Sequence, residues 1–241
     1  MRFSKLALAA LLVSAVSTTQ AQSFFTPVNS TTGGGSVDAK ADFTASNGQI
    51  TLILTNLLQN PGADSQLING ITFTVSGASS SGLLLTSNSG EISTISAGGA
   101  YTAGSSDSLA RWEATETAET IALTTLSGGT PNRLIIGADS KGNFDPSLGG
   151  KYLNANSSIT KNHNPNVLGT ATFTLTASGV TSASQFSHVV FNFGTAAGSN
   201  TVAGTMSRAT PALTPEPGNI ALVVGMSLSG AGFLVRRRRS H

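Results

Sequence analysis

The feature that most constrains the fold is an alternation of apolar residues with threonine, serine or asparagine through the middle of the chain. It is clearest in residues 49–55, 68–75, 170–176 and 188–193. Successive side chains of an extended strand point to opposite faces, so each segment has one apolar and one polar face. No segment of the body, residues 22–210, combines a sustained helical period with capping residues. The body is therefore expected to be all-β.

The alternation also predicts which side chains face the core. These are Ile50, Leu52 and Leu54; Ile71, Phe73 and Val75; Ala171, Phe173 and Leu175; and Val189, Phe191 and Phe193. Weaker strands are expected at 91–95, 110–114, 119–125 and 133–137. Asn47-Gly48 stands directly before the first clear strand and indicates a tight hairpin turn. Residues 138–166, rich in Gly, Asn, Ser and Pro, are expected to form a long loop.

A strand with one wet face is typical of antiparallel sheets, and two such sheets bury their apolar faces against each other. The body is therefore predicted to be a single antiparallel β-sandwich of about eight to ten strands. A β-solenoid is the main alternative. It requires a fixed repeat of about 20–50 residues, and the sequence has none.

Composition excludes several classes of site. The chain of 241 residues contains no cysteine, which excludes disulfides, a thiol nucleophile and Cys-ligated zinc or iron–sulfur sites. Its net charge of +2 comes from its two ends, because residues 22–210 hold seven basic and ten acidic residues, a formal charge of −3. A weakly acidic body without a basic stripe argues against nucleic-acid binding.

Residues 1–21 have the three parts of a secretory signal peptide. Arg2 and Lys5 form a basic start, residues 6–13 form a short apolar segment, and residues 17–21 are small and polar with Ala21 at the expected cleavage position. The apolar segment is too short for a membrane span, which takes about 20 residues. The protein is therefore expected to be exported.

The other end of the chain carries a second signal. Pro215, Glu216 and Pro217 precede an apolar run at 219–235, and Arg236, Arg237, Arg238 and Arg239 follow it. The run is expected to form a transmembrane helix, slightly short for an average bilayer. By the positive-inside rule, the arginine cluster holds its end in the cytoplasm and places the body outside the inner membrane.

This order of Pro-Glu-Pro motif, apolar helix and terminal basic cluster resembles the PEP-CTERM sorting signal of Gram-negative bacteria. The expected organisation is therefore a signal peptide at 1–21, the β-sandwich body at 22–210 and the sorting signal at 211–241. The resemblance implies processing by an exosortase near Pro215–Pro217, release to the cell surface or outside the cell, and association with exopolysaccharide and biofilm matrix. The body resembles the globular part of many such proteins at 162–165, 169–173 and 189–195, which implies no activity.

The search for catalytic residues finds few candidates. A Ser/His/Asp triad needs His163 or His188, of which the first lies in a loop and the second is expected to point to solvent. No Gly-x-Ser-x-Gly motif is present. Glu113, Glu116 and Glu119 could supply paired carboxylates for glycoside chemistry, but a solvated strand and turn is the favoured interpretation.

One loop is a candidate calcium site, and three aromatic residues are candidates for binding sugars. Residues 139–145 have acids six apart, yet Lys141 stands where a calcium loop needs an oxygen ligand, so an Asx-type turn is favoured over a calcium site. Trp112, Tyr101 and Tyr152 are the residues that could stack on sugar rings. For Trp112, which shares its strand face with two alanines, core packing is favoured.

The sequence therefore favours an exported, non-enzymatic cell-surface or matrix protein with no cofactor, no metal and no nucleic-acid partner. A carbohydrate-binding module that attaches to exopolysaccharide is the alternative, and it requires Trp112 or Tyr152 to be exposed. A secreted hydrolase is a third hypothesis, and it requires His163 or His188 within hydrogen-bond reach of an acid in a cleft.

Overall fold

The computed structural model describes residues 21–79, 82–102, 104–117, 120–127 and 130–206. The predicted signal peptide up to residue 20, the predicted transmembrane segment, the Pro-Glu-Pro motif and the arginine cluster lie outside these residues. Within them, no helix has the length and apolar character that a membrane crossing needs.

Fifteen strands and three short 3-10 helices make up the described fold. The strands are β1 (Ala21–Phe25), β2 (Thr31–Thr32), β3 (Gly35–Ser36), β4 (Ala39–Ser46), β5 (Gln49–Asn56), β6 (Ile68–Val75), β7 (Leu84–Ser93), β8 (Ser105–Asp107), β9 (Glu113–Thr117), β10 (Thr120–Thr124), β11 (Ile135–Ile136), β12 (Asn166–Thr176), β13 (Phe186–Phe193), β14 (Asn200–Ala203) and β15 (Thr205–Met206). The helices are η1 (Asp64–Gln66), η2 (Pro146–Leu148) and η3 (Lys161–His163).

The predicted all-β class is confirmed, with a difference in how the strands join. Thirteen strands form one mixed sheet rather than two separate antiparallel ones, and β2 pairs with β3 apart from it. The join is β11, which pairs antiparallel with β6 and parallel with β12. Parallel pairing is possible here because the long loop between β11 and β12 brings the chain back in the same direction.

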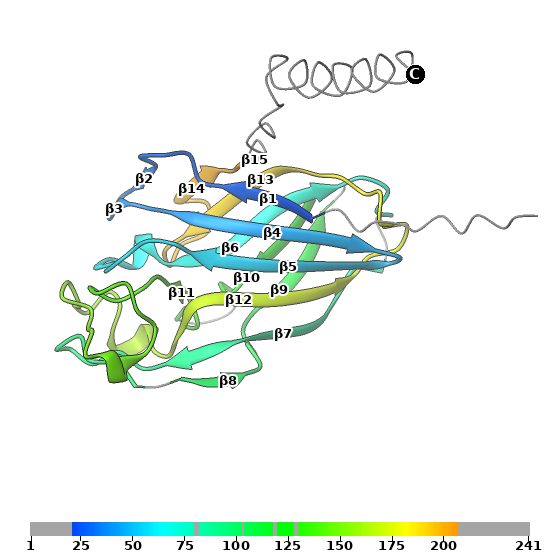
Figure 1. Ribbon diagram of the computed structural model, residues 1–241. Coiled ribbons are helices and arrows are strands. Elements are labelled where there is room, and N and C mark those ends of the chain that lie inside the picture. The colour runs from blue at the N-terminus through cyan, green and yellow to red at the C-terminus, as the bar shows by residue number, and fades with distance from the viewer. Residues whose placement is uncertain (1–20, 80–81, 103, 118–119, 128–129, 207–241) are drawn as a thin grey trace, which may run out of the picture. The chain divides into compact units, whose positions relative to one another are not determined.

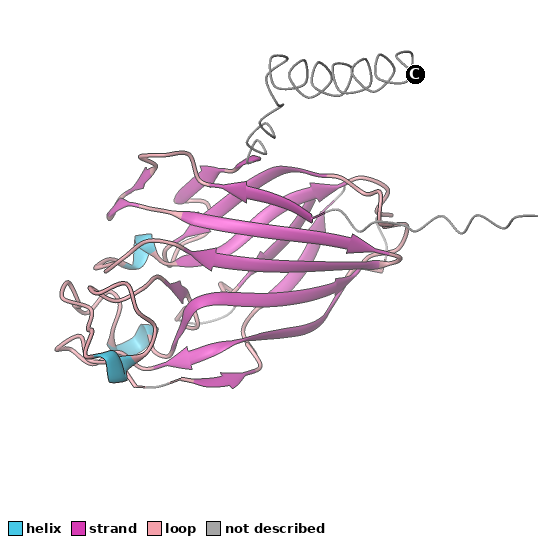
Figure 2. Ribbon diagram, viewed as in Figure 1, coloured by secondary structure: helices cyan, strands magenta, loops and turns pink. Residues whose placement is uncertain are grey.

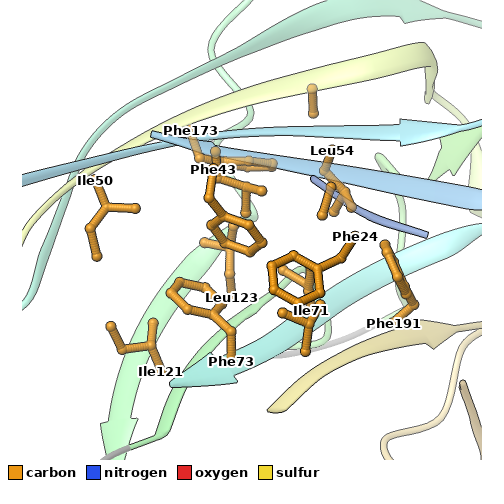
Figure 3. Close-up of a cluster of buried hydrophobic side chains, with 14 of the residues drawn as sticks. Phe24, Phe43, Ile50, Leu54, Ile71, Phe73, Ile121, Leu123, Phe173 and Phe191 are labelled. Atoms are coloured by element: carbon orange, nitrogen blue, oxygen red, sulfur yellow. The ribbon is translucent and has the colours of Figure 1, made fainter. Parts of the chain in front are cut away.

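The sheet folds over itself into two layers (Figures 1 and 2). Strands β7, β12, β5, β4 and β1 form one layer, and β9, β10, β6, β13 and β14 form the other. The space between them holds a large cluster of buried side chains, called the sheet core below (Figure 3). Its aromatic members are Phe24, Phe43, Phe73, Trp112, Phe173, Phe186, Phe191 and Phe193.

The alternation predicts this core correctly. All twelve side chains expected to face inward are buried, and the four main predicted strands lie within β5, β6, β12 and β13. The Asn47-Gly48 turn is also confirmed, because Ser46 pairs with Gln49 and leaves two residues between β4 and β5. Gly48 has a φ of 73°, a conformation that glycine adopts without steric cost.

The weaker predictions are less accurate. The strand predicted at 110–114 is wrong, because the Trp112 amide donates to the Leu109 carbonyl in a turn, and the strand begins only at Glu113. The predicted 91–95 overlaps the end of β7, 119–125 contains β10, and 133–137 contains the two residues of β11. Strand β4 is not among the predicted strands, because alanines fill three of its inward positions, at Ala39, Ala41 and Ala45.

Candidate functional site

A second cluster of buried side chains lies under the long loop and is called the loop core below. Its members are Leu67, Ile95, Tyr101, Leu134, Ile136, Tyr152, Ile159 and Leu168. The tyrosine rings of Tyr101 and Tyr152 meet edge to face with centroids 5.3 Å apart. The Tyr152 hydroxyl donates to the Gly137 carbonyl at 2.8 Å, and the Tyr101 hydroxyl donates to Asp139 Oδ2 at 3.0 Å. Both phenols are therefore used inside the fold.

The loop at 139–145 is built from hydrogen bonds between side chains and backbone. Asp139 is fully buried, and its Oδ1 accepts from the amides of Lys141 and Asn143 at 2.8 and 3.0 Å. Asp145 Oδ1 accepts from the Ser147 amide at 2.8 Å and caps η2. The Asx-type turn is confirmed. Across the described residues, no three His, Asp or Glu side chains gather as a metal-binding group.

Burial also decides the electrostatics of the two tyrosines. Desolvation raises the pKa of Tyr152 well above its usual value, and the neighbouring Tyr101 and Asp139 add to the shift. The pKa of Tyr101 is raised first by desolvation and then by its hydrogen bond to the Asp139 carboxylate. Both phenols stay protonated at neutral pH and act as hydrogen-bond donors in the loop core.

The three aromatic residues that could stack on sugar rings are all buried. Trp112 is 3% exposed, packs against Phe173 with ring centroids 4.8 Å apart, and donates from Nε1 to the Arg133 carbonyl. Tyr101 and Tyr152 are 7% and 1% exposed. Core packing of Trp112 is therefore confirmed. The hypothesis of a carbohydrate-binding module requires Trp112 or Tyr152 to be exposed, and neither side chain is.

The glutamates that could supply paired carboxylates do not lie on one face of β9. Glu113 and Glu116 are three residues apart on one strand, so their side chains start from opposite faces of it. Glu113 is exposed, as the interpretation as a solvated strand requires. Glu119 lies outside the described residues.

The two histidines among the described residues, His163 and His188, bond to oxygens other than carboxylates. His163 Nδ1 lies 3.0 Å from the Pro131 carbonyl oxygen, which it reaches as a donor. His188 Nδ1 lies 3.2 Å from Thr74 Oγ1 and 3.3 Å from Ser187 Oγ. Among the described acids, none is a hydrogen-bond partner of His163 or His188, so the acid–histidine pair that the hydrolase hypothesis requires is not found in this part of the chain.

His188 stands out because of its backbone. The pairing between β13 and β6 shifts register between Ser187 and Val190, and His188 has a φ of 49°. Such a left-handed conformation is uncommon for a non-glycine residue, and bulges of this kind re-aim side chains next to functional sites. His188 is exposed as predicted, and Val189 is buried.

The re-aimed histidine lines a surface groove of about 770 Å³, called the His188 groove below. Its walls come from the end of β6, the β9–β10 hairpin and the start of β13, with lining residues that include Thr74, Glu116, Thr120, Gln185, Ser187 and His188. Thr74 of β6 lies between two partners, with Thr120 of β10 directly opposite it on one side and Ser187 of β13 on the other. Thr74 Oγ1 and Ser187 Oγ lie 2.7 Å apart.

This arrangement concentrates hydrogen-bonding groups without the geometry of a catalytic triad. Ser187 and His188 are adjacent in sequence, and their contact uses the same Nδ1 that meets Thr74. Hydroxyl, amide, imidazole and carboxylate groups together suit a polar ligand that both donates and accepts hydrogen bonds. The groove is therefore the best candidate for a binding site in the described residues.

The groove does not follow from the sequence, because its residues are scattered along the chain. One hint is present. Phe186 is out of phase with the expected inward positions Val189, Phe191 and Phe193, although Val190 has the same phase as Phe186. A change of phase inside a strand marks an extra residue in the ladder, which is a bulge.

Comparison with protein-family models, with curated proteins and with solved structures finds no match to this chain.

Proposed function

We propose that this chain is an exported, non-enzymatic protein of the cell surface or extracellular matrix. Its body is a β-sandwich delivered by the N-terminal signal peptide. The precursor is held in the inner membrane by residues 219–235 and processed by an exosortase near Pro215-Glu216-Pro217. Association with exopolysaccharide follows from the resemblance to PEP-CTERM proteins.

The observation that carries the proposal is the position of the fold between the two signals. The first strand begins at Ala21, where the signal peptide is expected to be cut, and the last ends at Met206, nine residues before Pro215. Both core clusters lie inside these limits. Cutting at both signals would therefore remove only Ala21, the first residue of β1, from the described strands.

The two ends of the fold also lie together. β15 pairs with β1 through Phe24–Met206 and Phe25–Thr205, at one edge of the sheet. This arrangement supports a body that is tethered from one edge before it is released.

The proposal is tested by disabling the C-terminal motif. We expect Glu216→Ala together with Pro217→Ala to keep the chain in the inner-membrane fraction, while the wild-type body appears outside the cell. A matched change in the same linker, Thr210→Ala, leaves release unchanged. Equal release of both variants would contradict processing at Pro-Glu-Pro. A hydrolytic activity of the purified protein, lost on one point mutation, would contradict the non-enzymatic role.

Carbohydrate binding is the second candidate function. The observation that favours it is the His188 groove, where a sugar would be held by hydrogen bonds and not by stacking on an aromatic ring. We expect the wild-type chain to be retarded in gels containing exopolysaccharide isolated from its own host. The double variant Thr74→Ala, His188→Ala should lose that retardation, because it removes groups that converge in the groove. Trp112→Phe should retain it. Equal retardation of the wild-type and groove variants would assign binding elsewhere.

A further inference from the structure

Most of the large exposed apolar side chains of the described fold lie at one end of its strands. At this end β1 and β5 stop and β4, β6 and β12 start, and the connections 26–38, 57–67 and 137–165 lie there (Figure 2). Four exposed residues of these connections are together called the loop-end patch below: Val28 (91% exposed), Leu57 (43%), Leu148 (58%) and Leu153 (63%).

Hydrogen bonds between the connections hold the patch together. The Leu57 amide donates to the Asp38 carbonyl at 2.9 Å, which ties it to the connection that carries Val28. Val28 and Leu57 also line one groove of about 500 Å³. The Leu153 amide donates to Asn60 Oδ1 at 2.8 Å, which ties the long loop to the connection that carries Leu57. The apolar side chains therefore belong to loops that are fixed to one another.

The charged groups around the patch differ in how they are held. The acids of the three connections all accept hydrogen bonds from the fold: Asp38, Asp64, Asp139 and Asp145. Lys141 and Lys151 are exposed. The Lys141 amine lies 3.4 Å from the Leu148 carbonyl oxygen, and Lys151 stands two residues before Leu153. Exposed lysines beside apolar side chains are typical of segments that contact lipid headgroups.

The described chain ends close to the same end of the strands. Met206 is the last described residue, and it pairs with Phe24, one residue before the end of β1. Twelve residues, 207–218, separate it from the apolar run that starts at Asn219. Twelve residues span at most about 40 Å when fully extended. A chain anchored through 219–235 therefore keeps its folded body near the bilayer, where even weak contacts are favoured by high effective concentration.

We propose that the loop-end patch docks on the lipid surface of the inner membrane while the precursor is anchored there. The apolar side chains of the patch enter the headgroup region, and Lys141 and Lys151 contact lipid phosphates. The inference rests on the proposed membrane anchor and deepens it, because the body then lies on the bilayer in one orientation. Docking of this end keeps residues 207–218 near the membrane, where an integral membrane enzyme would cut.

The absence of cysteine from the chain allows a test with single labels. The full-length variants Val28→Cys and Leu153→Cys are reconstituted into vesicles of phosphatidylethanolamine and phosphatidylglycerol, and a membrane-impermeant, polarity-sensitive fluorophore then labels only bodies outside the vesicles. We expect blue-shifted emission that brominated lipids quench. Leu84→Cys is the matched control, because Leu84 is 61% exposed and starts β7 at the opposite end of the strands, where it pairs with Thr176. Its label should stay unquenched.

A charge substitution gives the second measurement. Val28→Asp together with Leu153→Asp should lower the quenching of a label at Leu57→Cys about twofold or more, because it removes apolar burial and places carboxylates against lipid phosphates. Leu84→Asp should leave that quenching unchanged.

The outcomes separate the docking from the anchor on which it rests. A chain that does not float with the vesicles would contradict the anchor and the docking together. A chain that floats, with patch labels quenched no more than the Leu84→Cys label, would overturn the docking alone. A blue shift at the patch that brominated lipids do not quench would assign the patch to a protein contact, such as a second copy, and would also overturn the proposal.

Discussion

The sheet core and the loop core are both fully buried, and they are held together in different ways. The sheet core is made of aliphatic and aromatic side chains on facing strands, with Phe43 stacked on Phe186 at 4.5 Å and tilted against Phe73 at 4.8 Å. The loop core is smaller and includes two tyrosines whose hydroxyls are satisfied by the Asp139 carboxylate and the Gly137 carbonyl. The sheet core depends on packing between the two layers, whereas the loop core depends on packing and on specific hydrogen bonds.

This difference shows what a protein without disulfides needs. Two packed layers bury apolar surface without directional bonds, so the sheet core gains from every large side chain. A loop of this length has many backbone polar groups to satisfy, so it needs side-chain partners such as Asp139, Asn60 and Asn156, which bond to loop backbone. The two regions should therefore respond differently to mutation and pH.

The largest effect is expected in the sheet core. Phe43→Ala should lower the free energy of unfolding by about 3–5 kcal/mol, because it leaves a cavity among Phe24, Phe73 and Phe186. Urea titration followed by the fluorescence of Trp112, the one tryptophan of the chain, measures it. Val28→Ala on the exposed loop is the control and should change stability by no more than about 0.5 kcal/mol. Equal effects of the two substitutions would contradict the assignment of the core.

A smaller effect is expected in the loop core. Asp139→Asn should cost about 1.5–3 kcal/mol, because a buried carboxylate that accepts three hydrogen bonds is replaced by an amide. Hydrogen exchange should accelerate at the amides of residues 139–152 and stay slow in β5 and β6. Uniform acceleration in both regions would show that the two cores unfold as one unit. Tyr101→Phe, combined with Asp139→Asn in a double-mutant cycle, isolates the bond between them.

Alkaline pH should separate the two regions without mutation. The pKa of each tyrosine is raised in the folded protein, so the folded state holds the phenol proton more tightly than the unfolded chain does. Their contribution to stability is full below the unfolded pKa of about 10 and falls as pH rises above it. Urea titrations from neutral to alkaline pH measure the loss, and phenolate absorbance follows both tyrosines of the chain. Tyr152→Phe should make the free energy of unfolding fall less steeply with pH. An unchanged dependence on pH would contradict the burial of the Tyr152 hydroxyl.

The smallest effect is expected outside both cores, at the bulge. His188→Gly should leave stability unchanged or raise it by up to about 1 kcal/mol, because glycine adopts the positive φ without steric cost. His188→Ala is the matched control, because it also removes the imidazole but leaves a non-glycine residue at the positive φ. Melting temperatures of the two variants measure the difference. A glycine variant less stable than the alanine variant would show that the conformation at His188 carries no strain.

The sheet core could be predicted from sequence because alternation determines which side of a strand is buried. Ile50, Phe73 and Phe173 follow directly from this rule, whereas β4 was missed because small alanines fill most of its inward positions. The loop core could not be predicted, because residues such as Asp139 and Tyr152 meet through turns that have no period. The His188 groove combines three distant segments, and the sequence hints at it only through Phe186, which is out of phase with Val189, Phe191 and Phe193.

Export and C-terminal processing are tested together by the intact mass of the protein recovered from its own host, determined for each cell fraction. We expect a species outside the cell that begins at or near Gln22 and ends near Pro215–Pro217. A chain with an uncut C-terminus in the inner membrane would contradict processing by an exosortase and the release of the body.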